Sequence, residues 1–180
     1  MTTSLTPPLS EQDHRLGPMD APVTLVEYGD YECPYCGMAF PIVNSIIRQM
    51  GDHLQFAFRQ FPLSRVHPHA EHAAEMAEAA GSRHAFWAMH NLLYQHQDAL
   101  EDEDLIAYAG AVGIDAQWAA TALATHRFVG RVREHFISGV RSGVNGTPTF
   151  FINGVRHDGG WDEPTLLATL QAASAAGVRR

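Results

Sequence analysis

The stretch Val23-Thr-Leu-Val-Glu-Tyr28, followed by Gly-Asp-Tyr-Glu and then by Cys33-Pro34-Tyr35-Cys36, decides the fold and contains both cysteines of the chain. Its apolar, β-branched first part predicts a buried strand, and Gly29-Asp30 predicts the turn that ends it. Residues 34–50 then carry apolar side chains at helical spacing. Cys33 is therefore expected at the N-terminus of a helix, with Pro34 at the first helical position, where the missing N–H costs nothing.

This placement of the cysteines has chemical consequences. Unpaired backbone N–H groups and the helix dipole favour an anion, so the Cys33 thiol should ionise more readily than a free cysteine. Cys36 lies one turn further on, close enough to close a small disulfide ring, and a Cys-x-x-Cys pair at a strand-to-helix junction is typical of a redox motif. The alternative is half of a zinc site, whose other ligands would have to be histidines such as His67, His69 and His72.

Composition limits the class of protein. A chain of 180 residues is long enough for one domain, or for one domain with an elaborate insertion. With 20 acidic against 12 basic residues the net charge is −8, and no Lys/Arg cluster interrupts it, which argues against nucleic acid or an anionic membrane surface as partner.

The N-terminal sequence bears on the expected compartment. It lacks the basic and apolar regions of a secretory signal, and no run approaches the length of a membrane span. The sequence as it stands predicts a soluble, cytoplasmic protein, although a chain whose signal had been removed would look similar.

The remaining elements follow in a recognisable order. Residues 1–16 predict an irregular arm, and the alternation of Leu54, Phe56 and Phe58 predicts a second strand. Strand, helix and strand form a βαβ unit with parallel strands and a right-handed crossover. A helical block comes next, and Asn153-Gly154 then predicts a hairpin. The expected helices of the block cover residues 69–80, 86–96, 104–112, 116–124 and 129–142; strands at 146–152 and 155–158 and a helix at 163–176 follow it.

The order β-α-β, helices, β-β-α, together with five short motifs, resembles the DsbA-like thiol–disulfide oxidoreductases. The resemblance covers residues 17–176 and is close to a group found both as separate proteins and fused to sodium/proton antiporters. It implies an α/β thioredoxin fold with a thioredoxin-like domain at residues 1–62 and 144–180 and an inserted helical domain at residues 63–143. The motifs are Asp20-Ala-Pro-Val-Thr-Leu-Val-Glu27, Cys33-Pro-Tyr-Cys36, Phe61-Pro-Leu63, Phe86-Trp87 and Gly146-Thr-Pro-Thr-Phe-Phe-Ile-Asn-Gly154.

The resemblance also implies roles for single residues. Cys33 would be the nucleophile and Cys36 the buried resolving cysteine, with Pro34 and Tyr35 at the substrate-binding surface. Thr147 and Pro148 would form the loop that faces the disulfide, with Pro148 in cis and the backbone of Thr147 free to pair with an incoming peptide. The alternative for these two residues is an ordinary proline at the entry to a strand.

Two further positions follow from the same comparison. Glu27 occupies the place of a buried acid behind the second cysteine, where a desolvated carboxylate could take the proton of the resolving thiol through a water; otherwise it points to solvent. Tyr35 stands where the strongly oxidising members carry histidine, and a neutral tyrosine offers the thiolate no cationic partner.

The predicted function is thiol–disulfide exchange on protein or small-thiol substrates, with an electron donor or acceptor that the sequence does not identify. It needs no organic cofactor and no metal. One alternative is a glutathione-dependent relative of the kappa-class transferases or hydroxychromene isomerases, in which the second cysteine is dispensable. Another is a non-catalytic domain in which the dithiol reports redox state to a partner.

Overall fold

The computed structural model describes residues 3–177. Two compact units make up the chain. The first, here called the sheet unit, contains the residues up to Gly29, Met38–Arg59, and those from Ser138 onward. The second, the helical unit, contains Asp30–Gly37 and Gln60–Ile137. The domain limits predicted after residues 62 and 143 stay a prediction.

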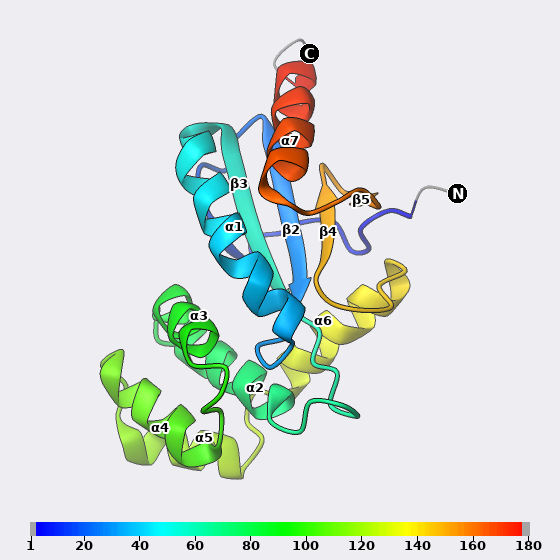
Figure 1. Cartoon of the computed structure of the whole chain (residues 1–180). Coiled ribbons are helices and arrows are strands. Elements are labelled where there is room, and N and C mark those ends of the chain that lie inside the picture. Colours follow the sequence, from blue (N-terminus) through cyan, green and yellow to red (C-terminus); the bar gives the residue numbers. More distant parts are fainter. Residues whose placement is uncertain (1–2, 178–180) are drawn as a thin grey trace. The chain divides into compact units, whose positions relative to one another are not determined.

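The sheet unit is built on five strands in the order β1-β3-β2-β4-β5. The strand β2 is buried along nearly its whole length, as its apolar run predicts, and α1 and α7 lie on one face of the sheet (Figure 1). Figure 1 also shows β2 and β3 running in the same direction, as expected for a βαβ unit. The bounds are β1 (His14–Leu16), β2 (Val23–Gly29), α1 (Pro34–Met50), β3 (Leu54–Gln60), β4 (Thr149–Ile152), β5 (Val155–His157) and α7 (Glu163–Gly177).

The hairpin predicted at Asn153-Gly154 is confirmed. Strands β4 and β5 pair antiparallel with Ile152 opposite Val155, so these two residues alone form the loop. Both have positive φ, +49° and +76°, which is the backbone that a tight hairpin turn requires and that Asn and Gly adopt most readily. The Asn153 side chain also accepts a hydrogen bond from the N–H of Thr24, 2.8 Å away, which joins the turn to β2.

The arm predicted to be irregular contains a strand that the sequence did not reveal. Residues His14–Leu16 form β1, which pairs antiparallel with β3 and places His14 opposite Phe58. Three residues are too few to show an alternation of apolar and polar side chains, so periodicity cannot detect such a strand.

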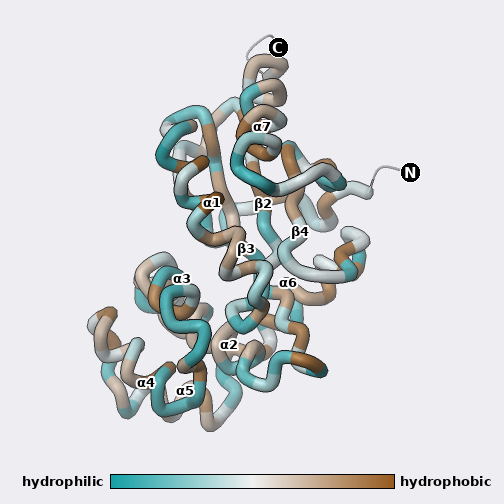
Figure 2. Tube along the Cα trace, viewed as in Figure 1, coloured by the Kyte–Doolittle hydropathy of each residue, from teal (hydrophilic) through white to brown (hydrophobic). Residues whose placement is uncertain are grey.

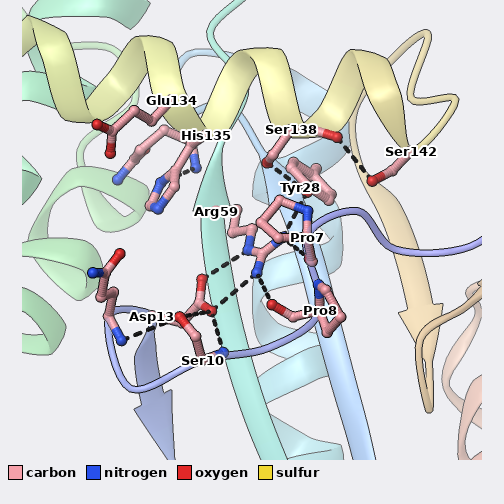
Figure 3. A network of polar contacts seen from close by, with 12 residues as sticks. Pro7, Pro8, Ser10, Asp13, Tyr28, Arg59, Glu134, His135, Ser138 and Ser142 are labelled. Atoms are coloured by element: carbon pink, nitrogen blue, oxygen red, sulfur yellow. Dashed lines mark hydrogen bonds and ion pairs between the residues drawn. The ribbon is translucent and has the colours of Figure 1, made fainter.

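The same arm is tied down by Arg59 on β3, whose side chain is buried (Figure 3). Its Nε donates to Oδ1 of Asp13 at 2.7 Å and one terminal nitrogen donates to Oδ2 at 2.9 Å. Burial alone would lower the pKa of Arg59, but the hydrogen bonds to Asp13 and Tyr28 and the negative charge of Asp13 raise it, so the guanidinium stays charged. Its other hydrogen bonds go to the carbonyl oxygens of Pro7 and Pro8 and to the hydroxyl of Tyr28.

The helical unit is arranged around α2, which packs against α3, α4 and α5. Its Ala-rich sequence allows close approach, and most of its residues are buried. Hydrophilic and hydrophobic residues are interspersed along the helices of this unit (Figure 2), as is usual for helices that bury one face and expose the other. Asp115 is the N-cap of the helix at Ala116–Ala124, because its carboxylate accepts the N–H of Trp118 at 2.8 Å. The helices are α2 (Ala70–Gly81), α3 (Phe86–Gln95), α4 (Asp102–Ala111), α5 (Ala116–Ala124) and α6 (Val129–Arg141), whose last residues belong to the sheet unit.

The predicted class, an α/β fold with helices between its βαβ and ββα parts, is confirmed by this order of elements. Between residues 3 and 177, no helix combines the length and the apolar character needed to cross a membrane.

Candidate functional site

The two cysteines lie at the start of α1. Cys33 immediately precedes the helix, and its N–H donates to the carbonyl of Asp30 at 3.2 Å. Its own carbonyl accepts the N–H of Gly37, which closes the first helical turn. Both cysteines are buried and in the thiol form, with no disulfide between them, whereas Tyr35 between them is 62% exposed. The expected position of Cys33 at a helix N-terminus is confirmed.

Asp30 holds the approach to the cysteines, although the sequence indicated only a turn at this residue. It is 1% exposed. One carboxylate oxygen accepts the N–H of Glu32 at 2.8 Å, and the other accepts the N–H of Leu63 at 2.8 Å and lies 2.7 Å from Nδ1 of His67. Glu32 continues the connection by accepting the N–H of His69 at 2.7 Å. The turn before Cys33 is therefore attached to the segment between β3 and α2.

Gln97, in the loop after α3, holds the reactive turn from another direction. Its side-chain nitrogen donates to the carbonyl of Tyr31 at 2.7 Å and to the carbonyl of Cys33 at 3.0 Å. A Cβ on Gly37 would meet the oxygen of Gln97 at 1.9 Å, so a residue without a side chain is required for this approach. In the sequence, the glycine directly after Cys36 was the one local indication of this contact. Nothing around its partner Gln97, 60 residues further along, indicated it.

Tyr31 anchors the same segment in the core of the helical unit. Its ring is fully buried, its hydroxyl lies 3.0 Å from Nδ1 of His90, and its ring packs 4.9 Å from that of Tyr94. A hydrogen-bonded tyrosine hydroxyl satisfies the polar group that burial would otherwise leave in an apolar environment. In the sequence, the only feature that points to His90 as a partner in the core is its position on the apolar face of its helix.

His67 is the main addition to the site that sequence reasoning missed. The sequence indicated it as a zinc ligand or as a residue near a helix N-terminus that is exposed or packs against the loop after Phe61. Burial by itself would lower the pKa of His67, but the hydrogen bond to Asp30 and the charges of Asp30, Cys33 and Glu32 raise it above its usual value. The carbonyl of Asp30 accepts the N–H of Cys33, so Asp30 joins His67 to the residue before α1. A protonated His67 thus offers this turn a cation that Tyr35, in place of histidine, does not.

The residues that could hold a metal gather elsewhere. Among the described residues, the clustered metal-ligating side chains are His72, Glu75 and His126, and neither cysteine belongs to this group. Of the three histidines considered for a zinc site with the cysteines, His67 is bound to Asp30, and His69 lies 3.5 Å from a carboxylate oxygen of Glu101.

The predicted site residues thus fall into two sets. Cys33, Pro34, Tyr35 and Cys36 belong to the helical unit, whereas Glu27, Thr147 and Pro148 belong to the sheet unit. Glu27 lies in β2 opposite Phe150 of β4 and is 2% exposed, so it does not point to solvent. The Thr147–Pro148 peptide bond, just before β4, is cis, as the resemblance implied. That these two sets act together on a substrate stays a prediction.

Comparison with known proteins shows the family and supports the fold described above. The family described as thioredoxin matches residues 9–172. The chain belongs to the thioredoxin family. In fold it is similar to BdbD of Bacillus subtilis in its oxidised form, with a TM-score of 0.83 at 23% identity over 97% of both chains. It is also similar to the thiol-disulfide exchange protein alpha-DsbA2 of Wolbachia pipientis, with a TM-score of 0.76 at 18% identity over 91% of this chain and 88% of that one. The resemblance to DsbA-like proteins is confirmed at the level of the fold.

The curated relatives add a different kind of information. Na(+)/H(+) antiporter NhaA 1 of Salinispora arenicola is 45% identical over 165 residues, which are 92% of this chain but 25% of that protein. The chain therefore spans about a quarter of the length of the curated relatives it matches. The similarity covers only a segment of each relative, so it gives no reason to assign ion transport to this chain.

Proposed function

We propose that this protein is a thiol–disulfide oxidoreductase in which Cys33 is the nucleophile and Cys36 the resolving cysteine. The observation that carries the proposal is the placement of a Cys-x-x-Cys pair in the first turn of α1, on a turn fixed by Asp30 and Gln97. Two sulfurs held one helical turn apart can close a disulfide without rearrangement of the helix, and a fixed turn keeps the sulfurs at that spacing.

The exchange can be written with its electrons and protons balanced. In the reducing direction the Cys33 thiolate attacks a substrate disulfide, forms a mixed disulfide, and releases one substrate thiolate, which takes up a proton. Cys36 then loses its proton and attacks the Cys33 sulfur, which releases the second substrate thiol and leaves the Cys33–Cys36 disulfide. Two electrons pass from the dithiol to the substrate, and the oxidising direction is the exact reverse.

The surroundings of Cys33 suit the thiolate that this chemistry requires. The thiol lies at the N-terminus of a 17-residue helix, where free N–H groups favour an anion. A protonated His67 adds positive charge, and a cation beside a thiol favours its ionised form. Pro34 and Tyr35 lie between the two cysteines in the sequence and are both exposed, as a surface for substrate would need.

The proposal gives the sheet-unit residues supporting roles. Thr147 and Pro148 would bind the substrate backbone beside the disulfide, and Glu27 would accept the proton that Cys36 gives up. The resemblance to DsbA-like proteins and the burial of Glu27 support these roles. The substrates would be proteins or small thiols, with a separate electron donor or acceptor.

The test is to trap the intermediate. A Cys36→Ser variant, mixed with a protein that contains disulfides, should accumulate a mixed disulfide through Cys33, because the resolving thiol is gone. Non-reducing electrophoresis and mass spectrometry of the linked peptide would identify the sulfur. Wild type should reduce or oxidise the same substrate over many turnovers and accumulate no adduct.

Three outcomes would contradict the proposal in different ways. Adducts that form only in a Cys33→Ser variant would reverse the two roles. Full turnover by Cys36→Ser with glutathione would favour the glutathione-dependent alternative. Wild type that forms its disulfide but turns over no substrate would favour the redox-sensing domain.

A further inference from the structure

A second group of reactive side chains lies in the helical unit, outside the site just described. His72 and Glu75 lie one turn apart on α2, and His126 lies in the short connection between α5 and α6. One ligand atom from each residue lies within 4.8 Å of those of the other two, and the two imidazole rings are 5.4 Å apart. The group therefore joins two elements that are 50 residues apart in sequence.

Glu75 is the unusual member of the group. Its side chain is 1% exposed, on a helix whose other buried positions are mostly alanine. Oε1 accepts a hydrogen bond from Nδ1 of His126 at 2.9 Å, but the buried Oε2 has no hydrogen-bond partner among the described residues. A carboxylate oxygen removed from water without a partner costs free energy, and a cation would remove that cost.

His126 is held by a backbone that disfavours its residue type. It follows the last turn of α5 with φ at +48°, and its N–H donates to Leu123 while that of Arg127 donates to Ala122. This is the Schellman motif, in which glycine is usual at the position that His126 occupies. The motif fixes the place of His126 at the end of α5, which holds its side chain against α2.

His72 is oriented as metal-binding histidines usually are. Its Nδ1 lies 2.6 Å from Oδ1 of Asp102, the first residue of α4. A hydrogen bond from Nδ1 to a carboxylate fixes the tautomer and leaves the lone pair of Nε2 available, which is the carboxylate–histidine–metal arrangement. Because the side chains of His72 and His126 are 35% and 52% exposed, an ion can reach the group from solvent.

We propose that His72, Glu75 and His126 form a binding site for a zinc ion, with Asp102 as the residue that positions His72. Two imidazoles and one carboxylate are ligands that zinc accepts, and a water would complete four-coordination. Ligand atoms of a tetrahedral zinc site lie about 3.4 Å apart when each is about 2.1 Å from the metal. The candidate ligand atoms in this structure lie within 4.8 Å of one another, so small side-chain rotations suffice to reach that spacing.

Zinc binding should depend on pH. Imidazole binds a metal ion only in its neutral form, so binding should release protons and should be tighter at pH 8 than at pH 6. Each histidine already contacts a carboxylate, His126 that of Glu75 and His72 that of Asp102, and these negative charges favour a cation at the group.

The experiment must separate this site from the cysteines, which bind zinc themselves. The full chain with Cys33→Ser and Cys36→Ser, without an affinity tag, would be freed of metal with a chelator and titrated with zinc by calorimetry at pH 6 and pH 8. Cobalt would serve as a second probe, because tetrahedral cobalt has strong visible absorption. One ion per chain is expected, bound more tightly at pH 8 than at pH 6.

The variants follow from the geometry. Glu75→Gln removes the anionic ligand and keeps an oxygen that can accept from His126. His126→Asn removes the imidazole and keeps a residue type that tolerates positive φ. Either change should abolish stoichiometric binding, whereas Asp102→Asn, which disturbs only the orientation of His72, should weaken it by about 10- to 100-fold. His69→Asn is the matched control on the N-cap of the same helix and should change nothing.

The proposal would be overturned by the absence of one-to-one binding in the background variant. It would equally be overturned if Glu75→Gln and His126→Asn, shown by circular dichroism to be folded, bound zinc as the background does. Loss on His69→Asn as strong as on His126→Asn would move the site to the pair His69 and His72. Because both cysteines are absent throughout, none of these results depends on the proposed oxidoreductase activity.

Discussion

Two buried aspartates, one in each unit, each join a loop to a distant element, but they do so through different partners. Asp13 of the sheet unit binds Arg59, which lies 46 residues away, and Asp30 of the helical unit binds His67, which lies 37 residues away. Arginine stays charged at every physiological pH, whereas histidine changes charge within that range.

The difference separates a structural contact from a functional one. The Arg59 pair closes the N-terminal arm onto β3, and both carboxylate oxygens of Asp13 are occupied by Arg59, Ser10 or both. Asp30 of the His67 pair accepts the N–H of Cys33 through its carbonyl, and the charge of Cys33 contributes to the raised pKa of His67. Because Arg59 is permanently charged, its contact with the N-terminal arm should not change with pH. Because His67 titrates, the charge near Cys33 should change with pH.

The largest expected effect is on the sheet-unit pair. Asp13→Asn leaves a buried guanidinium without its counter-charge, and removal of one partner of a buried ion pair costs about 3–5 kcal/mol. Urea denaturation should show this loss in the free energy of unfolding at both pH 6 and pH 9, because Arg59 is charged at both.

Its control is Glu11→Gln, an exposed acid two residues earlier, which should stay within about 0.5 kcal/mol of wild type. Equal denaturation midpoints for Asp13→Asn and wild type would show that the pair contributes little. A loss seen only at one pH would remove the distinction between the two aspartates.

A smaller effect is expected from substitution of a third buried acid, Glu27, and it should appear in a reaction rate. If Glu27 takes the proton of Cys36, Glu27→Gln should slow resolution of a preformed Cys33 mixed disulfide by about 10²-fold and leave the first attack by Cys33 unchanged. Stopped-flow fluorescence with a Cys33-linked probe would separate the two steps. The amide should also raise the denaturation midpoint at pH 8, because a neutral group is less costly to bury than a carboxylate.

The exposed acid Glu103 supplies the matched control, and Glu103→Gln should change neither rate nor midpoint. Wild-type kinetics in Glu27→Gln would exclude Glu27 from the proton transfer despite its burial.

What the sequence could predict was set by the range of the interactions. The strand β2, the helix after Cys33 and the Asn153-Gly154 turn have local causes, namely apolar runs, helical spacing and residues that tolerate positive φ, so a short window contains the evidence. The contacts of Asp30 and Gln97 are hydrogen bonds to main-chain groups 33 and 64 residues away. Any residue type can supply a main-chain group, so no pattern in the sequence marks the partner.

The titrating pair gives the smallest effect and the most direct test of the comparison. His67→Gln should lower the rate at which iodoacetamide alkylates Cys33 at pH 6 by about 3-fold, because a cation near a thiol favours the thiolate by an amount that solvent reduces at a partly exposed site. The two rates should converge as the pH rises above the raised pKa of His67 and the wild-type imidazole loses its charge. The matched control is His69→Gln, since the bond from this residue to Glu32 uses its main-chain N–H and survives the change.

The stability of the two proteins should follow the same titration with a sign that can be stated in advance. The pKa of His67 is raised in the folded state, so the protonated histidine stabilises the fold relative to the unfolded chain. That contribution is complete below the unfolded value of about 6.5 and is lost as pH rises through the folded pKa. The advantage of wild type over His67→Gln in urea should therefore be largest below pH 6.5 and shrink above it, in contrast to the constant loss expected for Asp13→Asn. An advantage that grows with pH, or one that parallels Asp13→Asn, would show that His67 acts as a neutral hydrogen-bond donor and that both aspartates have purely structural partners.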